Sequence, residues 1–148
     1  MRILVLPTAL LLVILLAACG STGEGGDLEV TLDEYSVVTD VDTLPEGPIK
    51  LDIKNVGTLE HELLIVDSDI PGAELPTKDD GSFDDDAGGV VVKHDIDDLE
   101  AGDETSRSYS LDPGSYVLLC NIVEDIDGTE TSHYAQGMWV EFTVTADE

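Results

Sequence analysis

A cysteine, two histidines and a methionine are the residues of this chain whose types could do chemistry together. Cys120, His133 and Met138 lie within one C-terminal stretch, CNIVEDIDGTETSHYAQGM, and His61 lies far upstream in GTLEHEL. Cys120 ends one apolar segment, Met138 begins another, and His133 lies in the polar stretch between them. Side chains at strand ends can be positioned accurately even when the connecting loop is irregular. We therefore treat the four residues as candidate metal ligands.

The donor set suits copper better than other metals. Thiolate sulfur favours Cu(I), imidazole is acceptable to both oxidation states, and two imidazoles with a thiolate and a long thioether bond make a blue-copper site. Zinc prefers four firm tetrahedral ligands, and a thioether is a poor one. Cys120 is the only cysteine of the chain besides Cys19. A bound metal would also account for this unpaired thiol, because metal binding keeps the sulfur deprotonated. Taken singly, His61 also fits an ordinary strand histidine, Met138 a core residue and Cys120 a small buried hydrophobe.

The segments that carry these residues are predicted to be strands. After the first 18 residues helical periodicity is almost absent, and short alternating segments are separated by turn residues. Residues 49–54 alternate strictly, with Pro48 before them and Asn55-Val56-Gly57 as a turn after them, which is typical of a strand buried on one face. About eight such segments predict an all-β fold, a Greek-key β-sandwich or barrel. The predicted strands are residues 28–32, 35–38, 49–54, 62–66, 90–93, 105–111, 115–119 and 139–145.

The stretch between Val66 and Val90 is acidic and contains several glycines and prolines. We expect it to be a long surface loop. Its carboxylates over residues 79–86 would also suit calcium, which takes oxygen ligands. Their spacing does not match that of an EF-hand loop, and a solvated loop is the preferred interpretation.

The N-terminus predicts export from the cytoplasm. Arg2 precedes an apolar run over residues 3–18, shorter than the about 20 residues of a membrane span. The run ends in small residues directly before Cys19, which resembles a bacterial lipobox and implies cleavage there and a lipid on the sulfur. An ordinary signal peptide or an uncleaved anchor is the alternative. The predicted division is a signal peptide (1–18), a flexible acylated tether (19–27) and one domain (28–148), held at the outer face of the membrane by the lipid.

The chain is strongly acidic. Its 33 Asp and Glu residues against six Lys and Arg residues give a formal net charge of −27 at pH 7. Such a charge argues against nucleic acid and anionic lipid headgroups as partners. It is typical of a solvated acidic surface, and it is also compatible with a high-salt habitat or with a basic partner protein.

Taken together, the motifs resemble those of a known family. The pattern N-x-G…H-E-L, then D-P-G-S-Y…C-N-I, then H-Y-x-x-G-M before a final strand is similar to that of the cupredoxins, and more narrowly to exported bacterial and archaeal cupredoxin-domain proteins. The resemblance covers essentially the whole domain. It implies a cupredoxin-like sandwich with one mononuclear copper ion bound by His61, Cys120, His133 and Met138. Plastocyanin-like members have very few residues between the cysteine and the second histidine, so residues 124–130 are interpreted as an insertion, which costs little additional closure entropy.

Four protein ligands leave no open position for a substrate, which a catalytic metal generally needs. We therefore expect one-electron transfer to a redox partner protein and no enzymatic activity, with His133 as the edge through which electrons leave. Two alternatives stay open: capture, storage or delivery of copper to an oxidase, and a metal-free structural sandwich.

The residues around the ligands carry weaker expectations. Glu62 and Asn121, next to His61 and Cys120 in the chain, are predicted to support the ligands by hydrogen bonds, because ligating side chains usually have such partners. Gly137 is predicted to allow a close approach of the backbone to the metal. His94 fits no ligand position and is expected to be a surface or structural histidine.

Overall fold

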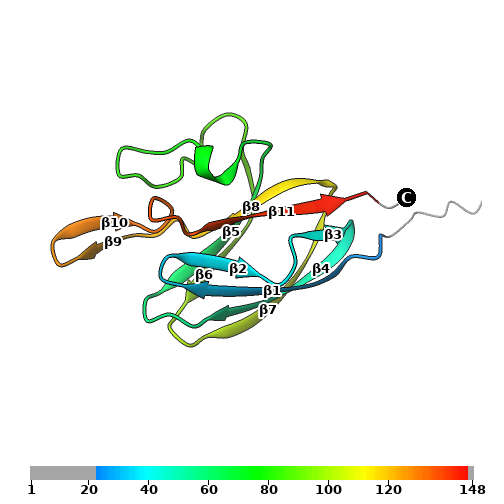
Figure 1. Ribbon diagram of the computed structural model, residues 1–148, viewed down its shortest axis with the longest axis horizontal. Helices are drawn as coiled ribbons and strands as arrows, with labels where there is room; N and C mark the ends of the chain where they lie inside the picture. Colours follow the sequence, from blue (N-terminus) through cyan, green and yellow to red (C-terminus); the bar gives the residue numbers. More distant parts are fainter. Residues whose placement is uncertain (1–22, 147–148) are drawn as a thin grey trace, which may run out of the picture.

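Two β-sheets packed face to face form the part of the chain that the structure, a computed structural model, describes, which is residues 23–146 (Figure 1). The prediction of an all-β fold is therefore confirmed. The predicted signal peptide and the predicted acylation site Cys19 lie outside the described residues. Within residues 23–146, no helix is long and apolar enough to cross a bilayer.

The first sheet has the strand order β2-β1-β4-β7. Its β1 runs parallel to β4 and antiparallel to β2, and β4 pairs antiparallel with β7. Alternate residues of β1 and β4 are buried, as the strict alternation in the sequence predicts. The bounds are Gly26–Asp33 for β1, Ser36–Thr39 for β2, Gly47–Asn55 for β4 and Glu104–Leu111 for β7.

The second sheet has the strand order β3-β11-β8-β5-β6. Its central strands β8 and β5 are buried along most of their length, because the first sheet covers one face and a long loop covers the other. The bounds are Thr43–Pro45 for β3, His61–Asp67 for β5, Val91–Leu99 for β6, Gly114–Leu119 for β8 and Trp139–Thr145 for β11.

A hairpin of two short strands lies outside both sheets. It is formed by β9 (Val123–Ile126) and β10 (Thr129–Ser132), which pair antiparallel, and it projects from the end of the sandwich opposite the C-terminus (Figure 1). Asp127 and Gly128 connect the strands with φ of 53° and 83°, the positive values that a two-residue type I′ turn requires. The segment interpreted as an inserted loop is therefore an ordered hairpin.

The segment between β5 and β6 differs from the expected surface loop. It contains a short 3₁₀ helix, η1 (Gly72–Glu74), and its Leu75 and Phe83 are buried against the outer face of the second sheet. The acidic residues of the loop point outward while these apolar side chains form a second small core. A long loop that packs its own hydrophobic residues is part of the scaffold.

The ordered domain also begins earlier than predicted. Strand β1 starts at Gly26, before the predicted domain start at Leu28, and the Gly25 N–H donates to the Glu46 carbonyl at 3.0 Å. The predicted flexible tether over 19–27 is therefore wrong for its last residues, because Gly-rich sequence here pairs with a neighbouring strand. Its first residues lie outside the described part of the chain.

Candidate metal centre

Three of the four predicted ligands bring their donor atoms together at the end of the sandwich from which the hairpin projects. His61 begins β5, Cys120 directly follows β8, and His133 directly follows β10. The distance from His61 Nδ1 to His133 Nδ1 is 3.2 Å, and Cys120 Sγ lies 3.3 Å from His133 Nδ1 and 3.9 Å from His61 Nδ1. All three side chains are 0% exposed. Two nitrogens and one sulfur thus face one buried point.

The spacing of these atoms fits a bound metal ion. Bond lengths of about 2.0–2.3 Å in a trigonal arrangement would separate two nitrogens and a sulfur by roughly 3.5–3.8 Å. The observed separations lie between 3.2 and 3.9 Å, so shifts of a few tenths of an ångström would accommodate the ion. The donor chemistry, two imidazoles with one thiol, is the set that copper prefers.

Met138, the fourth candidate, is fully buried beside this cluster. Its backbone joins the other two C-terminal ligands: the Cys120 N–H donates to the Met138 carbonyl, and the Met138 N–H donates to the His133 carbonyl, both at 3.1 Å. Gly137 has φ of 99° and open space around its Cα. Glycine therefore suits the positive φ of this tight loop, and the predicted close approach of the backbone to the metal stays a prediction.

His61 is aimed inward by the turn before it and by an irregularity in its strand. The buried side chain of Asn55 donates to the carbonyls of Leu59 and Leu99 at 2.8 Å and accepts from the Gly57 N–H at 2.9 Å. These bonds fix the loop that leads into β5. The register of β5 with β6 shifts immediately after His61, and such bulges commonly re-aim a side chain beside a functional site.

Cys120 lies in a low-dielectric environment. Burial raises the pKa of its thiol to about 11, so the thiolate needs a bound cation to be stable at neutral pH. The two predicted supporting residues act on the backbone here and not on the imidazoles. Glu62 accepts from the Asn121 N–H at 3.0 Å, and the Asn121 side chain bonds both the N–H and the carbonyl of Phe83. They tie the residue after Cys120 to β5 and to the long loop.

His133 is enclosed by the hairpin. The ring Nε2 lies 2.6 Å from Glu124 Oε1 on β9. The backbone N–H of His133 donates to the Ile122 carbonyl at 2.9 Å. The ring of His133 is fully buried, so it presents no edge to solvent, and its role as the edge through which electrons leave stays a prediction. The half-buried ring of Tyr35 contacts it edge-on, with ring centroids 5.1 Å apart. Glu124 was missed from the sequence, although the dipeptide Asp127-Gly128 is a turn signal for a hairpin that would have brought it near His133.

The imidazole of His61 has fewer hydrogen-bond partners than that of His133. Burial first, and then the neighbouring His133, lower the pKa of its imidazole, which keeps the ring neutral and able to bind a metal. Its Nε2 has no hydrogen-bond partner among the described residues, and Glu34 Oε1 lies 3.9 Å away. Although desolvation raises the pKa of Glu34, the N–H groups of Leu59 and Thr58 that donate to it lower that pKa to about 2.

Comparisons with solved structures identify the architecture. The chain matches an auracyanin of the photosynthetic bacterium Roseiflexus castenholzii with 22% identity and a TM-score of 0.53, over 81% of this chain and 96% of that one. It matches auracyanin B with 21% identity and a TM-score of 0.50, over 81% and 88%. It matches rusticyanin of Thiobacillus ferrooxidans with 14% identity and a TM-score of 0.55, over 82% and 79%.

The chain has the cupredoxin fold. The fold expected from the resemblance is therefore confirmed. No protein-family model matches the chain, and no curated protein matches it by sequence. On the cupredoxin sandwich, the three converging donor atoms lie where strands of the second sheet and the hairpin meet.

Other groups of polar residues lie away from this centre. His94, expected to be a surface or structural histidine, stacks on Tyr109 with ring centroids 3.6 Å apart and so joins edge strands of the two sheets. In the long loop, carboxylates of Asp84, Asp85 and Asp86 approach one another. Lys78 already pairs with Asp85 at 2.7 Å, so the calcium interpretation gains no support from the geometry.

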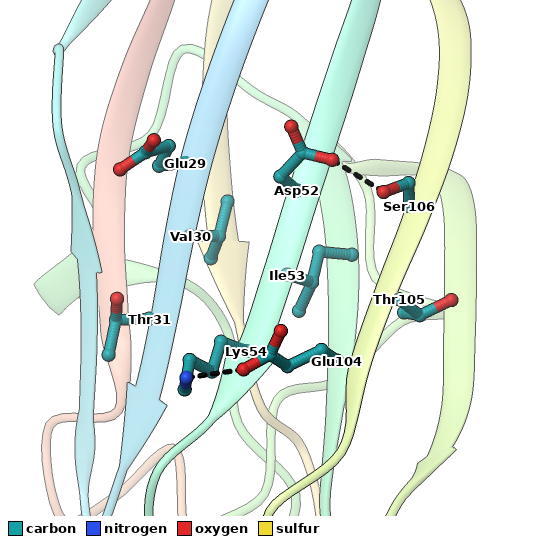
Figure 2. A pocket seen from close by; sticks show the side chains of 9 residues that line it. All are labelled: Glu29, Val30, Thr31, Asp52, Ile53, Lys54, Glu104, Thr105 and Ser106. Carbon is teal, nitrogen blue, oxygen red and sulfur yellow. Dashed lines mark hydrogen bonds and ion pairs between the residues drawn. The ribbon is translucent and has the colours of Figure 1, made fainter.

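A surface pocket on the first sheet is also separate from the centre. Figure 2 shows it crossing β1, β4 and β7, where Lys54 pairs with Glu104 and Ser106 donates to Asp52. Its lining side chains are carboxylates, hydroxyls, aliphatic groups and one lysine, with no imidazole or sulfur. It belongs to the outer face of the cupredoxin sandwich and offers no soft metal ligand.

Proposed function

We propose that this protein is a one-electron carrier that binds a single copper ion through His61, Cys120, His133 and Met138. The observation that carries the proposal is the convergence of two imidazole nitrogens and one thiol sulfur, all within 3.9 Å of one another at a fully buried point. Copper, when bound there, would supply one-electron cycling between Cu(II) and Cu(I). One of the structural neighbours, rusticyanin, is described as a copper protein, which supports the choice of metal.

The chain prepares the site before a metal arrives. Asn55 fixes the approach to His61, Met138 links the backbones of Cys120 and His133, and Glu124 bonds the outer nitrogen of His133. Ligands held in this way limit the change in geometry between oxidation states, which favours fast electron transfer. Burial of the whole ligand set leaves no position for a substrate, which favours a carrier over an enzyme. Burial also favours retention of the ion, which argues against a role in copper delivery.

We place the carrier outside the cytoplasm, anchored to the membrane by lipid on Cys19. The support for this location is the sequence alone, with its apolar run over residues 3–18 and small residues before Cys19. The redox partner would be a protein with a basic docking surface, since the net charge of −27 favours a partner of opposite sign. Nucleic acid is not a partner under this proposal.

Addition of Cu(II) to the purified protein tests the function directly. We expect an intense visible absorption band from the bond between copper and the Cys120 thiolate, and reversible reduction and reoxidation in voltammetry. Cys120→Ser should abolish the band, and Met138→Leu should keep the band but shift its position and the reduction potential. A colourless protein that gives up its metal readily to a chelator would indicate copper delivery instead. No binding at all would leave a metal-free sandwich.

A further inference from the structure

The contact between Glu124 and His133 brings a carboxylate to hydrogen-bond distance of the ring of a candidate ligand. Glu124 Oε1 lies 2.6 Å from His133 Nε2, and the His133 side chain is 0% exposed while that of Glu124 is 28% exposed. The carboxylate therefore meets the outer nitrogen of a fully buried candidate ligand from a partly exposed position. A short contact of this kind is a charge-assisted hydrogen bond or ion pair.

The hairpin holds Glu124 in this place through strand pairing and through contacts at its base. Glu124 pairs with Thr131 in the register of β9 and β10, and the hairpin closes where His133 N–H donates to the Ile122 carbonyl. At the base of the hairpin, the Ser132 hydroxyl donates to the Gly81 carbonyl of the long loop at 3.0 Å. Glu124 thus projects from a strand anchored at its base, not from a mobile loop.

The two imidazoles differ in the partner of their outer nitrogen, Nε2. His133 has a carboxylate partner at hydrogen-bond distance, whereas His61 Nε2 has none among the described residues and lies 3.9 Å from Glu34. The Glu34 carboxylate is already engaged by the N–H groups of Thr58 and Leu59. A partner on the outer nitrogen places the ring proton there and leaves the inner nitrogen free to bind a metal. The structure provides this arrangement for His133 only.

We propose that Glu124 is a positioning residue that fixes His133 with Nδ1 toward the metal and lowers the reduction potential of the centre. The inference rests on the proposed copper function. Reduction removes one positive charge from the centre, and a carboxylate in direct contact with a ligand stabilises the more positive, oxidised form more strongly. The hairpin that carries Glu124 is therefore a tuning element of the site.

Two charge-removing substitutions on the same hairpin test the inference. Glu124→Gln keeps the length of the side chain and an oxygen that can accept from Nε2–H, but it removes the charge beside His133. Glu130→Gln removes the same charge from an exposed position on β10. We expect the reduction potential of the copper form to rise clearly with Glu124→Gln and to change little with Glu130→Gln. Equal potentials in the two variants would overturn the inference.

A measurement on the metal-free protein tests the positioning role independently. Nitrogen NMR shifts of the His133 ring should show the Nε2–H form in the unsubstituted protein and in Glu124→Gln, and a loss of that preference in Glu124→Ala. An unchanged form in Glu124→Ala would overturn the positioning role. If the unsubstituted protein failed to cycle copper, the proposed function would fail and this inference with it. If the unsubstituted protein cycled copper normally but Glu124→Gln and Glu130→Gln had equal reduction potentials, only this inference would be overturned.

Discussion

At the scale of single residues, the ligand types could be predicted from the sequence but their partners could not. The soft donors are rare in this chain, so their order alone was informative. Glu62 and Asn121 were chosen as supporting residues because they are neighbours in sequence, and the structure shows them bonding backbone near Cys120. The partner of His133 is Glu124, which reaches it only because the hairpin folds back. Hydrogen-bond partners of this kind depend on tertiary pairing.

Asn55 shows how much one buried side chain can do for a distant ligand, and it leads to a prediction. Asn55→Ala removes three hydrogen bonds and leaves the buried Leu99 carbonyl without its side-chain donor. We expect a loss of unfolding free energy on the order of 3 kcal/mol, together with weaker copper binding, because the loop into His61 is no longer fixed. Urea denaturation and a copper titration would measure both effects.

The neighbouring exposed residue supplies the control for this prediction. Val56→Ala changes a side chain that is 48% exposed in the same turn, and it should alter stability by no more than about 0.5 kcal/mol. Equal stability of the two variants would contradict the role given to Asn55.

At the scale of elements, the short apolar segments located the strands of both sheets except β3, and only the first part of β6 was predicted. The hairpin and the packing of the long loop also escaped prediction. The hairpin strands β9 and β10 are four residues each, with apolar side chains only at the two ends of β9, so no alternating apolar pattern marks them. The long loop was interpreted from its carboxylates, and the few apolar residues among them proved to be its anchors. The long loop is also bonded to the segment between His133 and Met138, where the Tyr134 hydroxyl donates to the Gly72 carbonyl at 2.6 Å.

Phe83 is the anchor whose removal should be most informative. It is fully buried in the second small core, and its backbone is bonded to the side chain of Asn121 next to Cys120. Phe83→Ala should lower the free energy of unfolding by about 3–5 kcal/mol because it leaves a cavity. Chemical denaturation would measure the loss, with Val38→Ala, at an exposed position of β2, as the control. A loss below about 1 kcal/mol would mean that the loop is not part of the scaffold.

At the scale of the whole molecule, acidity dominates. With a net charge of −27, the described surface carries carboxylates close to one another, as where Glu62, Asp95 and Asp97 meet on neighbouring strands. Mutual repulsion of this kind opposes the compact state and is screened by salt. Composition predicted the charge, but not which carboxylates would be brought together by the pairing of β5 with β6.

The pH dependence of stability should report this crowding. Burial first, then Asp97 and Asp85, raise the pKa of Asp95 from 3.8 to about 6, and burial also raises the pKa of Glu62. The folded protein thus keeps a proton on Asp95 that the unfolded chain has released. This contribution to the free energy of unfolding is fully present below about pH 4 and is lost as the pH rises through 6.

Asp95→Asn should flatten the fall in stability between about pH 4 and 6, because the substituted side chain does not titrate. Thermal or urea unfolding at several pH values would measure the slope, and the exposed Asp79→Asn variant in the long loop should leave it unchanged. An unaltered slope in Asp95→Asn would show that the crowding around this carboxylate has no effect on folding.

The hydrogen bond between His133 N–H and the Ile122 carbonyl has a consequence for how such proteins are found. Because the chain leaves the centre and returns to it at adjacent points, the excursion between them can vary in length without moving a ligand. A motif search that fixes a narrow spacing between the cysteine and the second histidine would overlook this chain. A search that requires only the order of the four donor residues, with a gap of variable length after the cysteine, would retrieve it.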